Sequence, residues 1–127
     1  MILLYIAVGG AFGSLGRYLL SLSMQRPGEF PTGTLVVNVI GSFLLGFIVR
    51  LALETTQVTP ELRAFLVVGF CGGFTTFSTF AWETLALAEQ GSWGRSLLYL
   101  GLSVVLALAG CVAGMSAARQ AVSALHR

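Results

Sequence analysis

Four long apolar stretches divide the chain, and short polar connectors separate them. The stretches cover about residues 2–24, 32–53, 60–88 and 95–121. Each is long enough to cross the hydrocarbon core of a bilayer, for which a helix needs about 20 residues. The pattern predicts an all-α membrane protein with four transmembrane helices in a single domain, residues 1–127.

The third stretch differs from the others because its middle is rich in glycine and hydroxyl residues. Thr59 and Pro60 predict its start, with the threonine as N-cap and the proline in the first turn. Gly72 and Gly73 each weaken a helix by about 1 kcal/mol relative to alanine. The stretch is also longer than a straight span requires, so it predicts a helix broken at mid-membrane. At that depth, backbone N–H and C=O groups that lose their helical hydrogen bonds must be buried in protein or line a water-filled cavity. A break here therefore indicates an ion or solute pathway.

The second stretch carries one polar row on an otherwise apolar helix. Thr34, Asn38 and Ser42 follow one another at intervals of four residues, and Gly46 continues the row. A buried amide without partners costs about 1–3 kcal/mol, so Asn38 is the most demanding member. Two interpretations of Asn38 stay open: a hydrogen bond that joins two helices, and a donor that lines a pathway.

Glycine spacing in the first and fourth stretches favours close helix packing. Gly9 and Gly13 are four residues apart, as are Gly110 and Gly114. Small residues at this interval let two transmembrane helices approach closely.

Composition narrows the class of protein further. Of the 127 residues, 56% are hydrophobic and 9% charged, which leaves no room for a soluble domain. The seven basic residues are all arginines near the ends of the apolar stretches. They form no clustered basic face, so nucleic acid is not an expected partner. Cys71 and Cys111 lie far apart without a neighbouring histidine, which indicates packing residues and no zinc site.

These arginines barely favour one orientation in the membrane. One side of the membrane would carry four arginines, Arg50, Arg63, Arg119 and Arg127. The other side would carry three, Arg17, Arg26 and Arg95. So small a difference scarcely selects a topology under the positive-inside rule. Insertion both ways up would let antiparallel protomers pair about a two-fold axis in the membrane plane. A homodimer would also supply pathway walls that four helices alone do not provide.

The polar residues within the spans favour an anion over a cation. Hydroxyl and amide groups can replace the hydration water of a small anion. Phe77 and Phe80 could turn the positive edges of their rings toward it, and core filling is the alternative. Glu83 is read either as part of the pathway or as a hydrogen-bonded structural carboxylate. Arg17 is read either as an interfacial anchor or as a charge at a pathway mouth.

Two segments resemble the signature sequences of the bacterial Fluc/CrcB family of fluoride channels. They are residues 33–46, GTLVVNVIGSFLLG, and residues 69–80, GFCGGFTTFSTF. The length, the four spans and residues 16–18, GRY, match as well, so the resemblance covers the whole chain. It implies a channel and not an enzyme, built as a dual-topology homodimer around a structural sodium ion. Such a channel lies in the cytoplasmic membrane and exports fluoride passively.

The same resemblance implies roles for individual residues. Asn38 would donate to fluoride, while Phe77 and Phe80 would face it with their ring edges. The backbone carbonyls of Gly72 and Thr75 would hold the sodium ion. The remaining pathway residues would be Arg17, Thr76, Ser78, Thr79, Glu83, Tyr99 and Ser103. Some relatives continue a row of hydroxyls along the fourth span, where this chain has Ala107.

Three other functions fit the sequence less well. A small multidrug exporter also has four spans, but it needs a membrane-embedded glutamate in the first, and this chain has none. An assembly subunit would explain the glycine spacing but would require neither the broken helix nor Asn38. A membrane enzyme would need a nucleophile with a base or a cluster of metal ligands, and the sequence indicates neither.

Overall fold

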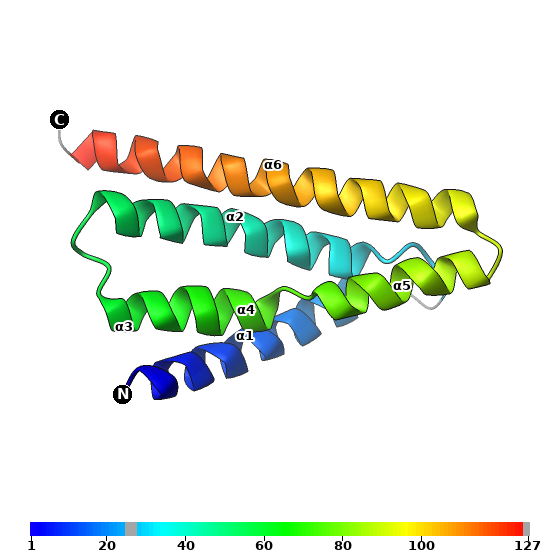
Figure 1. Cartoon of the computed structure of the whole chain (residues 1–127), viewed down its shortest axis with the longest axis horizontal. Coiled ribbons are helices and arrows are strands. Elements are labelled where there is room, and N and C mark those ends of the chain that lie inside the picture. Colours follow the sequence, from blue (N-terminus) through cyan, green and yellow to red (C-terminus); the bar gives the residue numbers. More distant parts are fainter. Residues whose placement is uncertain (25–27, 126–127) are drawn as a thin grey trace.

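The structure is a computed structural model that describes residues 1–24 and 28–125. All regular elements in these ranges are helices, and four of them are long and apolar enough to cross a membrane (Figure 1). The four spans are Ile2–Met24, Thr32–Glu54, Pro60–Glu89 and Trp93–Leu125. The all-α, four-span prediction is therefore confirmed, although the fourth span begins earlier and ends later than expected. Arg26, Arg127 and the start of the first connector lie outside the described residues.

Seven helical elements make up these spans. They are α1 (Ile2–Met24), α2 (Thr32–Glu54), α3 (Pro60–Arg63), the π-helix η1 (Ala64–Cys71), α4 (Gly72–Phe74), α5 (Phe77–Glu89) and α6 (Trp93–Leu125). The third span starts as predicted, because the Thr59 side chain accepts a hydrogen bond from the amide of Leu62, with Pro60 in the first turn. This bond satisfies one of the amides that a helix start leaves without a partner.

Glycines let the helices approach closely. A Cβ added at Gly13 would lie 2.8 Å from the amide nitrogen of Phe74, and one added at Gly114 would lie 2.9 Å from that of Phe47. Both distances are too short for a real side chain, so α1 packs directly on the third span and α6 on α2. The second and fourth spans run side by side in the same direction (Figure 1).

The glycines of the third span serve this same packing. Gly72 and Gly73 are helical, although the sequence favoured them as the residues that break the helix. A Cβ at Gly73 would lie 2.6 Å from the carbonyl oxygen of Gly10 on α1. Close approach between helices therefore explains Gly73, and the departure from helical geometry comes two residues later.

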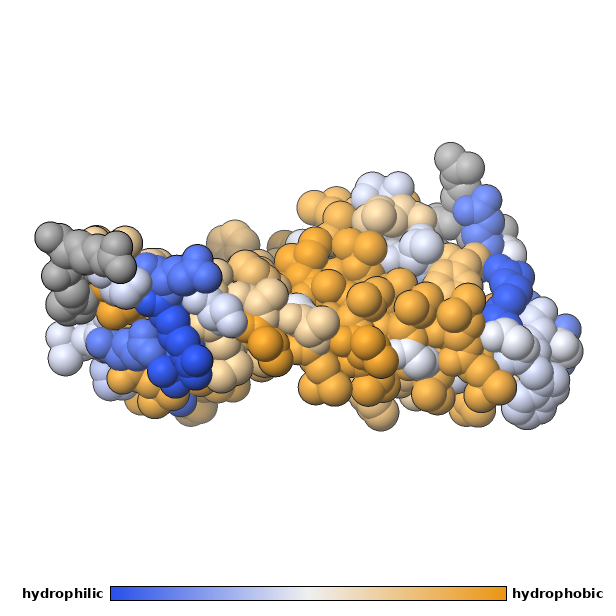
Figure 2. All heavy atoms as spheres, turned by 90° about the horizontal axis from the view of Figure 1, so that it is seen from above, coloured by the Kyte–Doolittle hydropathy of each residue, from blue (hydrophilic) through white to orange (hydrophobic). Residues whose placement is uncertain are grey.

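The surface of the molecule is apolar around its middle. Figure 2 shows hydrophobic residues over the central part and hydrophilic residues toward both ends. Phe12 on α1 and Val105 on α6 are 59% and 62% exposed, whereas the core cluster consists of Phe80, Leu87 and Tyr99. So large an exposed apolar surface suits lipid or another membrane helix and does not suit water.

Candidate ion pathway

The third span leaves helical geometry at two residues. Thr75 has φ −80° and ψ 158°, and Thr76 has φ −150° and ψ 118°, so both are extended. The helix resumes at once, because the Thr76 hydroxyl oxygen accepts a hydrogen bond from the amide of Thr79 at 3.3 Å. Extended residues give up the hydrogen bonds that a continuous helix would make. Their backbone groups therefore need partners from elsewhere in the protein.

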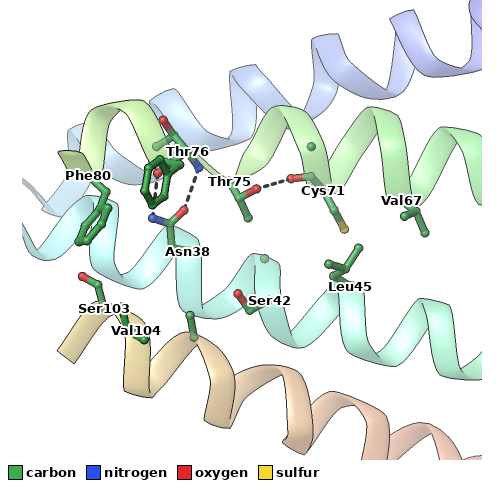
Figure 3. Close-up of a pocket in the computed structure, with 14 residues that line it drawn as sticks. Asn38, Ser42, Leu45, Val67, Cys71, Thr75, Thr76, Phe80, Ser103 and Val104 are labelled. Atoms are coloured by element: carbon green, nitrogen blue, oxygen red, sulfur yellow. Dashed lines mark hydrogen bonds between the residues drawn. The ribbon is translucent and has the colours of Figure 1, made fainter. Parts of the chain in front are cut away.

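Asn38 on α2 provides those partners. The amide nitrogen of Thr76 donates to Asn38 Oδ1 at 2.8 Å, and Asn38 Nδ2 donates to the carbonyl oxygen of Thr76 at 3.0 Å (Figure 3). One side-chain amide thus pairs with both polar groups of one backbone residue. Because Nδ2 carries two hydrogens, one N–H still has donor capacity. Asn38 joins two helices and also lines the cleft described below, so its two interpretations do not exclude each other.

Thr75 is held by its own helix and by α1. Its backbone amide and its hydroxyl both donate to the carbonyl oxygen of Cys71, at 3.0 and 2.9 Å. Its carbonyl oxygen accepts a hydrogen bond from Arg17 Nη1 at 3.3 Å. The half-buried guanidinium of Arg17 therefore lies beside the extended residues. Arg17 therefore contacts backbone within the third span, so it is more than an interfacial anchor.

A second polar cluster centres on Glu83 of α5. Its Oε1 accepts from the Thr34 hydroxyl at 3.0 Å, and its Oε2 accepts from the Tyr99 hydroxyl at 2.7 Å. Both donors are buried, with exposed fractions of 2% for Thr34 and 0% for Tyr99. Each carboxylate oxygen thus has a charge-assisted hydrogen bond, which stabilises the group inside the protein. The cluster joins α2, α5 and α6, as the structural interpretation of Glu83 requires.

Phe77 and Phe80, the two phenylalanines of α5, lie together but in different surroundings. Their ring centroids are 5.5 Å apart, so they share one face of α5. Phe80 is buried and its ring lies 5.4 Å from that of Tyr99, whereas Phe77 is 79% exposed. Core filling accounts for part of the role of Phe80 and for none of the role of Phe77.

One cleft of about 360 Å³ brings most of these groups together (Figure 3). It lies between α2, α6 and the extended part of the third span. Seven of the predicted site residues line it, namely Asn38, Gly72, Thr75, Thr76, Phe77, Phe80 and Ser103. Ser103 Oγ is buried within reach of the Tyr99 hydroxyl, which donates to Glu83, and makes no well-formed hydrogen bond of its own among the described residues. The cleft therefore offers donors in otherwise apolar surroundings, which suits a small anion.

The other predicted residues lie around this cleft. Glu83 borders a separate, smaller pocket of about 130 Å³, and the buried Tyr99 donates its hydroxyl to Glu83 at 2.7 Å. The hydroxyls of Ser78 and Thr79 are 3.4 and 3.1 Å from that of Thr76, at the start of α5. Ser42 was not predicted as a site residue, yet it lines the cleft. Its place in the polar row with Asn38 was the signal that could have identified it.

Comparisons with known proteins agree with one another. Residues 4–115 match the family model described as CrcB-like protein, Camphor Resistance (CrcB). The fluoride-specific ion channel FluC of Geobacter sulfurreducens is 51% identical over 120 residues, which cover 93% of this chain and 97% of the relative. The FluC of Methanopyrus kandleri is 48% identical over 113 residues, covering 89% and 86%. The FluC of Agrobacterium fabrum is 45% identical over 116 residues, covering 90% and 93%.

The pairing of Asn38 with Thr76 generates a stability prediction. Asn38→Ala leaves the buried amide and carbonyl of Thr76 without partners, at a cost of about 1–3 kcal/mol each. We therefore expect a clearly lower melting temperature of the purified protein in detergent. Asn38→Asp keeps the acceptor for the Thr76 amide and loses the donor to its carbonyl, so its melting temperature should fall between the two.

The control is Ser116→Ala, which removes an exposed hydroxyl that donates to a carbonyl of its own helix. This variant should have the same melting temperature as the wild type. An Asn38→Ala protein as stable as the wild type would show that the side chain does not hold the extended segment.

Proposed function

The chain belongs to the CrcB-like family, and on this premise we propose that it is a fluoride-selective ion channel. Fluoride would leave the cell through it passively, across the cytoplasmic membrane, which lowers the intracellular concentration. Three relatives with the name fluoride-specific ion channel match over most of both chains. The observation in the structure that supports the proposal best is the donor-lined cleft beside the extended residues Thr75 and Thr76.

The groups in the cleft suit fluoride in particular. A small, strongly hydrated anion enters a protein only where hydrogen-bond donors replace its water. The second N–H of Asn38 and the buried hydroxyl of Ser103 are two such donors. The edge of the Phe80 ring carries partial positive charge and can contact the ion directly. Arg17 adds a full positive charge next to the extended segment.

The carboxylate of Glu83 has a supporting role in this proposal. A negative charge facing the cleft would repel an anion. Both of its oxygens instead accept O–H donors, from Thr34 and Tyr99. These bonds hold the carboxylate to the side of the cleft, where it fixes the position of the Tyr99 ring against which Phe80 packs.

We further propose that two copies of the chain assemble antiparallel in the membrane, each bringing the third span close to a shared two-fold axis. The small number of arginines at the span ends, Arg50, Arg63 and Arg119 against Arg95, leaves only a weak preference for one orientation. Phe77, which is 79% exposed, and the exposed Gly72 both line the cleft. A partner copy would cover both and complete the walls of the cleft.

A structural sodium ion belongs to the same proposal, with the carbonyls of Gly72 and Thr75 as ligands. The amide of Thr76 bonds to Asn38, so the Gly72 carbonyl lacks its helical donor and can accept a cation. The Thr75 carbonyl already accepts from Arg17 at 3.3 Å, but it has a second lone pair. Among the described residues no three His, Cys, Asp or Glu side chains form a metal cluster. Neutral carbonyls suit a monovalent ion, and two protomers would provide four of them.

The direct experiment is ion efflux from liposomes that contain the purified protein. With fluoride inside, we expect release at a rate far above that of empty liposomes, recorded with a fluoride electrode. With chloride inside, release should stay at the level of empty liposomes. Fluoride release no faster than from empty liposomes would overturn the proposed function, and equal chloride release would overturn its selectivity.

The ring-edge contact predicts the effect of Phe80→Leu. Leucine keeps the site apolar but removes the polarised ring edge, so we expect fluoride efflux to fall by about tenfold. The matched control is Phe12→Leu, which changes a phenylalanine exposed on the outer face of α1 and should conduct like the wild type. Unchanged efflux in Phe80→Leu would leave core filling as the role of this ring.

The assembly and the sodium ion predict three further results. The purified protein should elute as a dimer in size-exclusion chromatography. Its melting temperature should be higher in sodium chloride than in N-methylglucamine chloride, because an ion bound only to the folded state stabilises it.

A membrane-impermeant thiol reagent should label Ser123→Cys from both sides of the membrane. Elution as a monomer would contradict the dimer. Equal melting temperatures in the two salts would contradict the sodium ion, and labelling from one side only would contradict the dual topology.

A further inference from the structure

The cleft between α2 and the third span continues past its donors toward one end of the spans. Figure 3 shows Val67 and Leu45 at the end of the cleft that is away from Phe80. Val67 also lines a second hollow of about 400 Å³, which therefore adjoins the cleft along the third span. The other residues around this hollow are Ala52, Val58, Pro60, Arg63, Ala64 and Val68. Because Pro60 is the first residue of the third span, the hollow reaches the membrane surface.

Arg63 is the only charged residue that the described part of the chain contributes to the cleft or to this hollow. Its side chain is exposed and makes no hydrogen bond or ion pair within that part. Every other described residue around the hollow is apolar. The guanidinium therefore lies at the rim of an apolar hollow, and no carboxylate of the described residues pairs with it.

The neighbouring carboxylates are held away from Arg63. Glu61 borders a different hollow, beside Tyr5 of α1. Residues two apart on a helix do not face each other, which separates Glu61 from Arg63. Glu54, at the end of α2, pairs with Arg50 of the same helix. The fold thus leaves an uncompensated positive charge on the side of the hollow that leads to the cleft.

A positive charge in a hollow with apolar walls attracts anions and repels cations. One unit charge about 5 Å from an anion in water raises the local anion concentration by about fourfold. Arg63 precedes the extended residue Thr75 by 12 positions, so an ion at the rim is still roughly 15–18 Å from the extended segment. Capture of an ion at the rim and loss of its water at the donors of the cleft are therefore separate steps.

We propose that the hollow at Arg63 is the aqueous mouth of the anion pathway and that Arg63 forms an entry site there for a hydrated fluoride ion. The ion keeps its water at Arg63 and exchanges it for protein donors only when it reaches Asn38. This inference rests on the proposed fluoride channel, and it places one mouth of the pathway at the membrane surface where α2 ends.

Charge variants at Arg63 test the entry site in fluoride efflux from phosphatidylcholine liposomes, whose lipids carry no net charge. Ionic strength is set with potassium gluconate on both sides, and valinomycin lets potassium follow the fluoride. At an ionic strength of about 10 mM the screening length is about 30 Å. Under this condition Arg63→Gln should lower the rate by about twofold, because only one end of each pathway is changed, and Arg63→Glu by about fourfold.

Two further measurements identify the effect as electrostatic. Arg63→Lys keeps the positive charge, so its rate at low ionic strength should exceed that of Arg63→Gln. At an ionic strength of about 1 M the screening length is about 3 Å, and all Arg63 variants should conduct like the wild type. A defect in folding or packing would not disappear when salt is added.

The matched control is Arg119→Gln, which neutralises an exposed arginine of α6 that borders neither the hollow nor the cleft. Its rate should equal that of the wild type at both ionic strengths. All variants are first compared by size-exclusion chromatography, so that a change in assembly is recognised.

The possible outcomes separate the two proposals. An unchanged rate in Arg63→Gln at low ionic strength, with an active wild type, would overturn the entry site and leave the channel proposal intact. This result would follow if a lipid phosphate or a carboxylate of a partner copy neutralised Arg63. A loss that persists at about 1 M salt, or an equal loss in Arg119→Gln, would also overturn the entry site. A wild type without fluoride efflux would overturn the channel proposal and this inference together.

Discussion

The need to pair every backbone polar group in apolar surroundings governs this structure. Two consecutive residues, Thr75 and Thr76, are extended within a segment that could otherwise span a membrane as one helix. An unpaired amide or carbonyl in hydrocarbon costs several kcal/mol. Asn38 removes this cost for Thr76 by pairing with both groups at once, and Arg17 pairs with the carbonyl of Thr75. The extended segment can persist because α1 and α2 provide these partners.

The extended segment in turn sets the direction of α5. The helix restarts with the Thr76 hydroxyl as its cap, so the rotation of the helix about its axis is fixed from its first turn. Phe80 then packs against Tyr99, and Glu83, almost one turn later, receives the hydroxyls of Tyr99 and Thr34. One asparagine on α2 thereby affects the position of a carboxylate about two turns along a different helix.

The seam between α2 and α6 gives this arrangement its chemical character. Gly46, Gly110 and Gly114 bring the C-terminal parts of the two helices into close contact. Asn38, Ser42 and Ser103 thus lie in one cleft with donor capacity that their own helices do not use. A protein that only needed stability would satisfy such groups internally. Donors left available in this cleft are the feature on which the proposed anion pathway rests.

The sequence by itself determined the features that depend on local patterns. Runs of apolar residues specify four spans because length and hydropathy decide whether a helix can cross a bilayer. Thr59 and Pro60 specify a helix start through bonds made within four residues. Glycine spacing indicated close packing, and the row of Thr34, Asn38 and Ser42 indicated a polar face on α2, since a helix repeats about every 3.6 residues.

Tertiary structure alone decided which groups meet. Gly73 was expected to break the helix, yet it remains helical and packs on α1, because the approach of a neighbouring backbone is not encoded in local propensity. The pairing of Asn38 with Thr76 and the two donors to Glu83 also depend on how the helices are rotated and shifted relative to one another. That choice balances packing over whole helices, so no short stretch of sequence contains it, and it separates the buried Phe80 from the exposed Phe77.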